Sequence, residues 1–290
     1  MHYEIANLTH DENNPVIEFI AEIPEAEVNN LFDMYKYMTV YKQAHKLAEL
    51  SVDNGIALQQ YIKAIYAGKY KNEKDKEKLA DTANRLTYNY CSSFGTLIDI
   101  YEKLLGKIDK AREKAFHSYT NELHSNNLEY RLFCHMRDYC IHYDFPYTNY
   151  SETEKEIELV CTRTHLLKFD GWKLAKNDIK GMDEKINLAK YIPKMNSLIY
   201  ALFLDFLYHI ADKIDGTSKI VEKLYDKYKP SIPFAIITLS NEQYDKIQKH
   251  KLDLSADELK FNITEIDIKL LKEAINNIIH NPNVKVELIK

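Results

Sequence analysis

The stretch NEKDKEKLADTANRLTYNY, residues 72–90, decides the fold class. It opens with charged residues of the kind favoured at a helix start. The apolar side chains that follow recur every three or four residues: Leu79, Ala83, Leu86 and Tyr90. This period places them on one helix face, and the pattern continues to about residue 126 with a break expected near Gly106. Long helices with one apolar face pack as antiparallel bundles, so the stretch predicts a mainly α fold.

Similar helical periods lie on both sides of this stretch. Residues 25–68 have one, with a break expected at Asp53-Asn54-Gly55. A motif helix is predicted over 127–143, since Pro146 disfavours helix at the residue before it. A further helix is predicted over 183–214. Between these last two, residues 156–172 (EIELVCTRTHLLKFDGW) alternate apolar and polar side chains, which predicts a β-hairpin with a turn at Asp170-Gly171.

The two ends of the chain add strand-like segments. PVIEFIAE, residues 15–22, predicts a short strand before the first helix. The C-terminal part mixes helical and alternating segments: a helix at 217–228, strands at 233–239 and 260–266, a helix to about 279 and a final VKVELI. We therefore expect a helical bundle over residues 1–215, interrupted by the small β-hairpin, and a small α/β extension over residues 216–290.

Composition excludes several classes of protein. The chain has 290 residues, a formal charge of −5 and a pI near 6.1, which argues against coating of its whole surface by nucleic acid but permits a local basic site. The most apolar run, residues 198–207, is too short to span a membrane, and the N-terminus lacks a signal-peptide pattern, so a cytoplasmic protein is expected. No cysteine pair has zinc-ligand spacing and no glycine-rich phosphate loop occurs, so no metal or cofactor is expected.

Residues 131–146 are the segment whose residue types indicate chemistry. At about 100° per residue, four polar side chains share one stripe of the motif helix: Arg131, His135, Asp138 and His142. A neighbouring stripe is apolar: Leu132, Met136, Tyr139, Cys140 and Tyr143. The helix is therefore expected to pack with one face and to present the polar stripe at its margin. Asp138 precedes His142 by one turn, where its carboxylate is placed to hold one imidazole nitrogen of a proton-transferring histidine.

Arg137 is the second basic residue of interest. It lies about 140° around a straight helix from His142, so one chain does not point both side chains at the same atom. A distortion of the helix here would bring the two side chains together. Two copies of the helix meeting across a two-fold axis would also mix their side chains, and this second arrangement predicts a homodimer. The chain has five arginines among 39 basic residues, and two of them fall in this segment. Arginine binds phosphate with a planar fork of donors, so its use here favours a phosphate ligand.

The run Arg137-Asp138-Tyr139-Cys140-Ile141-His142 resembles the signature motif of HEPN domains. Its continuation through Pro146, the following insert and the helix from 183 are similar to a group of uncharacterised bacterial proteins with an Arg-Asn-Tyr…His…Pro segment. The resemblance covers roughly residues 75–213, and Asp138 stands where that pattern more often has asparagine. HEPN proteins are helical bundles, commonly dimeric, and many are metal-independent ribonucleases of toxin–antitoxin, CRISPR or phage-defence systems, whereas others only bind.

The resemblance implies a role for each residue of the motif. His142 would be the acid/base, Arg137 the ligand of the scissile phosphate of an RNA substrate, and Asp138 the polar helper. The neighbouring side chains are expected to contact substrate: Arg131, His135 and Tyr143. An antitoxin or a defence-system protein is an expected partner. The alternative function is a non-catalytic helical module that uses the same stripe to bind a protein or RNA.

Other basic residues give weaker patterns. His117 and His124 lie seven apart on a predicted helix with no third ligand spaced to join them, so we interpret both as surface histidines. A run of basic residues between 107 and 114 is interpreted as a solvated helix face: Lys107, Lys110, Arg112 and Lys114.

Overall fold

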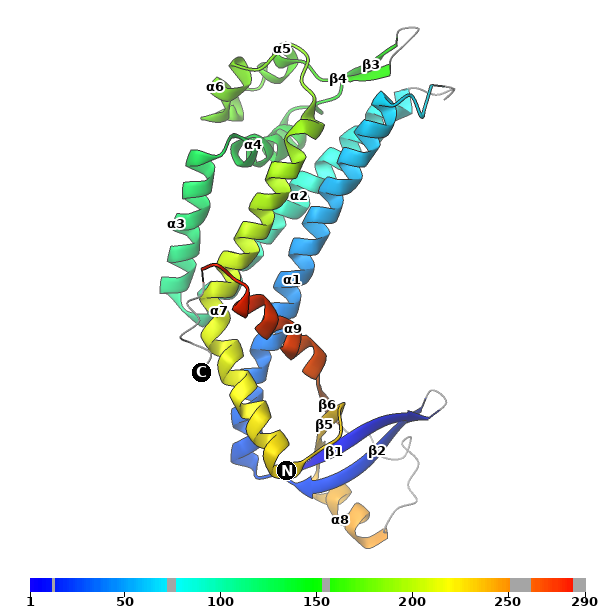
Figure 1. Cartoon of the computed structure of the whole chain (residues 1–290), viewed down its shortest axis with the longest axis vertical. Helices are drawn as coiled ribbons and strands as arrows, with labels where there is room; N and C mark the ends of the chain where they lie inside the picture. The colour runs from blue at the N-terminus through cyan, green and yellow to red at the C-terminus, as the bar shows by residue number, and fades with distance from the viewer. Residues whose placement is uncertain (12–13, 72–76, 153–156, 251–261, 284–290) are drawn as a thin grey trace. The chain divides into compact units, whose positions relative to one another are not determined.

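The computed structural model describes residues 1–11, 14–71, 77–152, 157–250 and 262–283, and most of them are helical (Figure 1). The mainly α fold with small β elements is confirmed. The longer helices are α1 (Glu25–Tyr66), α2 (Glu77–Ile108), α3 (Lys110–Asn126), α4 (Leu128–His142), α7 (Ile192–Tyr228), α8 (Asn241–His250) and α9 (Ile268–Ile279). The short ones are α5 (Arg163–Leu166), α6 (Ala175–Lys180) and the 3₁₀ turns η1 (Asp170–Trp172) and η2 (Leu188–Lys190). Among the described residues, no helix combines the length and apolar composition needed to cross a membrane.

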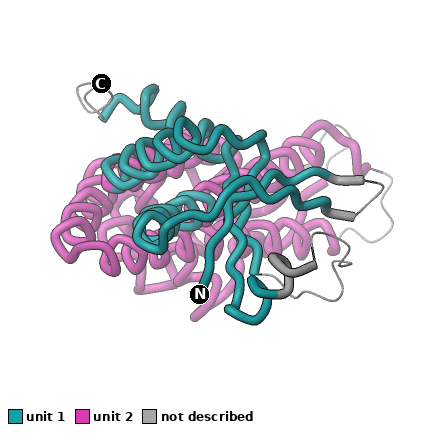
Figure 2. Tube along the Cα trace, turned by 90° about the horizontal axis from the view of Figure 1, so that it is seen from below, with its two compact units in different colours: residues 1–42, 210–290 teal, residues 43–209 magenta. Residues whose placement is uncertain are grey.

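The chain divides into two compact units (Figure 2). One consists of residues 43–209, and the other joins residues 1–42 with residues 210–290. The predicted division at residue 215 is therefore not the one in the structure. The physical reason is strand pairing: β1 (His2–Asp11) hydrogen-bonds along β5 (Phe234–Leu239), so the start of the chain completes a sheet with the C-terminal segment.

Within residues 43–209, α2 lies beside parts of α1 and α7. The Tyr101 hydroxyl donates a 2.7 Å hydrogen bond to the carbonyl oxygen of Ala44, and the Tyr90 hydroxyl donates a 2.8 Å bond to Oδ1 of Asn196. The predicted break at Asp53-Asn54-Gly55 is wrong, because α1 runs through it as a continuous helix. Gly55 serves close packing instead: a Cβ there would lie 2.5 Å from Asn196 Oδ1. The break expected near Gly106 is confirmed, since α2 ends at Ile108.

The predicted hairpin over residues 156–172 is displaced in the structure. The antiparallel pair is β3 (Asn149–Glu152) with β4 (Ile157–Val160), and the chain then turns into α5 and η1. Thr162 caps α5 by accepting a hydrogen bond from the backbone N–H of His165, which favours helix over strand here. Trp172 is fully buried, and its indole N–H donates to the carbonyl oxygen of Leu166. These local bonds and the burial of one large ring outweigh the alternating pattern.

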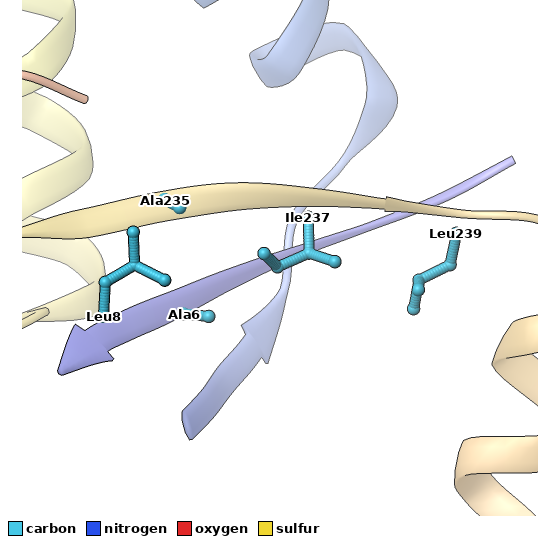
Figure 3. Close-up of a cluster of buried hydrophobic side chains, with 5 residues drawn as sticks. All are labelled: Ala6, Leu8, Ala235, Ile237 and Leu239. Atoms are coloured by element: carbon cyan, nitrogen blue, oxygen red, sulfur yellow. The ribbon is translucent and has the colours of Figure 1, made fainter. Parts of the chain in front are cut away.

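The other unit is built on a four-stranded antiparallel sheet. Its order is β2-β1-β5-β6, with β2 at Asn14–Glu22 and β6 at Asn262–Ile266. The predicted strands at 15–22, 233–239 and 260–266 and the helix ending near 279 are thus confirmed to within about two residues. One face of the sheet buries a small apolar cluster (Figure 3) of Ala6, Leu8, Ala235, Ile237 and Leu239. The predicted VKVELI strand lies outside the described residues.

Candidate functional site

Helix α4 carries the predicted motif and packs against α2, α3, α6 and η1. Its buried face holds Tyr130, Leu132, Phe133, His135, Met136, Tyr139 and Cys140. The predicted 127–143 helix is confirmed almost to the residue, as α4 begins at Leu128 and ends at His142. The chain beyond it is held by Asn84 of α2, whose side-chain amide accepts from the backbone N–H of Tyr147 and donates to its carbonyl oxygen. These two hydrogen bonds tie the segment that follows α4 to α2.

Arg131 is fully engaged by neighbouring residues. Its Nε and Nη2 donate to the two carboxylate oxygens of Asp178 on α6, at 2.9 and 3.2 Å. Its Nη1 donates to the carbonyl oxygens of His124 and Ser125 at the end of α3. The guanidinium therefore ties three helices together. This geometry departs from the substrate contact expected of Arg131, because its donors are used within the protein.

His135 is buried rather than displayed at the margin of the helix. Its Nε2 lies 3.2 Å from Nε2 of His124, so one ring donates a hydrogen bond to the other between α3 and α4. Its Nδ1 lies 3.8 Å from Oδ2 of Asp138, too far for a hydrogen bond, and has no such partner among the described residues. His124 is half-buried in this pair, so its interpretation as a surface histidine is wrong. The histidine pair joins two helices.

The pKa values of both histidines lie below the usual range. Burial is the main cause for each, since it disfavours the charged ring. The charges of Arg131 and Lys173 lower the pKa of His124 further, while His124 and Lys173 act on His135. Asp178 and Asp138 act in the opposite direction on His124 and His135 respectively. Burial therefore favours the neutral form of both rings.

This neutral pair predicts a loss of stability in mild acid. In the unfolded chain each imidazole takes up a proton near pH 6.5, whereas burial in the folded protein disfavours protonation of both rings. The unfolded state then binds more protons, so the free energy of unfolding should fall as the pH drops below about 6.5. Chemical denaturation between pH 5 and 7.5 measures this slope. The double variant His124→Gln/His135→Gln should have a flatter one, and equal slopes for the two proteins would contradict the assignment.

Arg137 has no ion-pair or hydrogen-bond partner among the described residues, and its Nε is buried. Its side chain lies against Gly95 of α2, where a Cβ would come within 2.8 Å of Nη1 and 2.9 Å of Cδ and Cζ. Cys91 is one turn earlier on α2; burial raises the pKa of its thiol, and the charge of Arg137 opposes that rise. The other half-buried arginines are engaged: Arg112 donates to the His209 carbonyl, Arg131 to Asp178 and Arg163 to the Met182 carbonyl. Arg137 is thus an unneutralised cation.

His142 is exposed as the last residue of α4. Within the described part of the chain, no hydrogen bond or ion pair joins it to Asp138 or to Arg137. The expectation that Asp138 holds His142 is therefore not met, because Asp138 lies nearer His135. Arg137 faces α2 while His142 ends the helix, in keeping with the 140° separation expected from their spacing. The imidazole is open to a ligand or to a second chain.

Tyr143 leaves the apolar stripe where the helix ends. It is 49% exposed, and its ring contacts Tyr139 and Phe169 at centroid distances of 5.5 and 5.7 Å. Tyr139 in turn stacks on the buried Trp172 at 5.4 Å. Tyr143 is therefore an exposed ring on a packed aromatic cluster beside His142.

Sequence reasoning missed several residues around the motif. Gly95, Asp178 and His124 contact it from α2, α6 and α3, and nothing in their local sequence pattern points to α4. His165 lies 3.2 Å from the carboxylate of Asp144, just beyond the motif helix. Such contacts depend on how the helices pack, which one sequence does not state.

All four cysteines carry free thiols. No cluster of three or more His, Cys, Asp or Glu side chains suited to a metal ion occurs in the ranges that the structure describes. Comparison of the chain with family models, with curated proteins and with solved structures returned no significant match.

Proposed function

We propose that the protein is a metal-independent endoribonuclease in which Arg137 binds the scissile phosphate and His142 is the general acid/base. The observation that carries the proposal is the unneutralised guanidinium of Arg137. The half-buried guanidinium carries a positive charge, and an anionic ligand at its exposed part would balance that charge while Nε stays enclosed. RNA presents a phosphate that matches the planar fork of arginine. Arg131 offers no such donors, since Asp178 and two carbonyls hold them.

The chemistry follows from an imidazole beside a bound phosphodiester. Neutral His142 accepts the proton of the ribose 2′-hydroxyl, and the 2′-oxygen attacks phosphorus. The bond from phosphorus to the 5′-oxygen breaks, and a protonated imidazole returns the proton to that leaving oxygen. The products are a 2′,3′-cyclic phosphate and a 5′-hydroxyl. Arg137 stabilises the negative charge that builds on the phosphate during attack.

In this proposal, Arg137 and His142 come together between two copies of the chain. Arg137 faces α2 and His142 ends α4, and no contact joins them within the described residues of one chain. Two α4 helices that meet near a two-fold axis bring Arg137 of one copy to His142 of the other. The exposed His142 and Tyr143 leave that end of α4 open to such a contact. An antitoxin or defence-system protein covering the same end would block cleavage.

An RNA-cleavage assay tests the proposal. The purified chain is incubated with end-labelled RNA in EDTA, and the ends of the fragments are identified. We expect cleavage with cyclic-phosphate ends, because imidazole and guanidinium perform every step. Fragments that vanish in EDTA would overturn the mechanism.

A second function is favoured by one observation. The Nε of Arg137 is enclosed against α2 while His142 is exposed at the helix end, an arrangement that suits binding without cleavage. In this case the chain is a helical module that binds RNA or a protein partner through α4. RNA that is retained by the protein and stays intact in the same assay would favour this function.

A further inference from the structure

We infer that Gly95 of α2 is a positioning residue that sets where the Arg137 guanidinium lies. The inference rests on the proposed role of Arg137 as the phosphate ligand. The three heavy atoms nearest to a Cβ built on Gly95 all belong to Arg137: Nη1 at 2.8 Å and Cδ and Cζ at 2.9 Å. The guanidinium therefore occupies the space that any other side chain at position 95 would take.

Backbone conformation does not explain why residue 95 is a glycine. It lies well inside α2, and no positive φ is recorded for it. Glycine in a helix interior is less favourable than alanine, so the position carries a cost that needs a local cause. The close approach of Arg137 is that cause. Gly95 is buried and Arg137 is half-buried, and of the Arg137 nitrogens only Nε is among the buried side-chain atoms without a partner in the described residues.

Adding one methyl group tests this directly. In Gly95→Ala the new Cβ meets the flexible end of an arginine side chain rather than backbone, so the guanidinium moves and the helices stay. The matched control is Gly106→Ala on the same helix, where the Cβ meets the carboxylate of Glu113 at 2.6 Å, away from α4. Both variants exchange glycine for alanine in α2 and crowd charged side chains, Arg137 in one case and Glu113 with its partner Lys110 in the other.

The first measurement does not depend on activity. Isotope-labelled protein gives a separate side-chain Nε–H signal for each of the five arginines, and Arg137→Lys assigns the one from Arg137. We expect this signal to exchange slowly with water in the wild type and in Gly106→Ala. In Gly95→Ala it should exchange at least about tenfold faster, because the displaced Nε leaves its enclosure. Equal exchange in all three proteins would overturn the inference whether or not the chain cleaves RNA.

The second measurement tests whether the position of the Arg137 guanidinium affects the rate of RNA cleavage. Gly95→Ala should lower the rate of RNA cleavage roughly 10- to 100-fold, while Gly106→Ala stays near the wild type. Added to Arg137→Ala, Gly95→Ala should have no further effect, since it acts through that side chain. A further loss in the double variant would contradict this. If the Nε–H signal of Arg137 exchanges faster in Gly95→Ala but none of the proteins cleaves RNA, the ribonuclease proposal is refuted and the positioning role of Gly95 is supported.

A folding defect would be informative too. If Gly95→Ala unfolds the chain, the double variant Gly95→Ala/Arg137→Ala removes the three atoms nearest to the new Cβ and should restore a cooperative thermal transition. A double variant that stays unfolded would show that Gly95 serves packing other than that of Arg137 and would overturn the inference.

Discussion

Arg137→Ala and His142→Ala are each expected to lower the rate of RNA cleavage by about 10²- to 10⁴-fold. His142→Ala removes the group that accepts the proton of the ribose hydroxyl. Arg137→Ala removes the cation that stabilises the charged phosphate in the transition state. Initial rates on labelled RNA at saturating and subsaturating concentrations measure both losses, and the Arg137 variant should also bind RNA more weakly.

Folding should hardly change in either variant. His142 is exposed, so its removal opens no cavity, and surface substitutions usually change stability by less than about 0.5 kcal/mol. Arg137 forms no hydrogen bond or ion pair among the described residues, so truncation also removes an unsatisfied buried donor. His117→Ala is the matched control, because His117 is an exposed histidine on α3 that pairs with Glu102. Full activity in Arg137→Ala and His142→Ala would place the site elsewhere.

The second large effect concerns stability. Arg131→Ala should lower the free energy of unfolding by about 2–4 kcal/mol, because it leaves Asp178 unpaired in a largely buried place. The two side chains are only 14% and 22% exposed, and two carbonyl oxygens lose their donor as well. Urea denaturation followed by circular dichroism measures the loss.

Arg163→Ala provides the comparison for Arg131. Its ion pair with Glu184 is 37% and 48% exposed, where water screens the charges, and one carbonyl oxygen, that of Met182, loses its donor, so a loss of about 1 kcal/mol is expected. Asp178→Asn should resemble Arg131→Ala in direction. If Arg131→Ala and Arg163→Ala cost the same, Arg131 does not hold α3, α4 and α6 together, and a role in substrate contact would return.

Local patterns predicted most of the helices, but the separate helices expected at 183–214 and 217–228 are one continuous helix, α7. The motif helix and the C-terminal strands were placed to within about two residues. Two errors had physical causes. Asp53-Asn54-Gly55 has turn-forming composition, yet packing of α1 against Tyr90 and Asn196 keeps the helix continuous. The alternation in residues 156–172 was overridden by the cap at Thr162 and the burial of Trp172.

The surroundings of the site were harder to predict than the motif itself. Helical geometry predicted that the side chains of Arg137 and His142 point in different directions on one chain. It placed His135 on a polar margin, but packing of α3 against α4 buries this ring with His124. Arg131 was expected at the substrate and instead binds Asp178, a residue 47 positions away in the chain. Contacts of this range depend on tertiary packing, which the spacing of residues within one helix does not contain.

The composite site is tested most directly by mixing two inactive variants. Arg137→Ala and His142→Ala are unfolded together, refolded as a mixture and assayed for RNA cleavage. If each site takes Arg137 from one chain and His142 from the other, mixed dimers keep one intact site, and activity should return to about one quarter of the wild-type rate. A mixture as inactive as its components, although the wild type cleaves RNA as a dimer, would contradict a site shared between two chains.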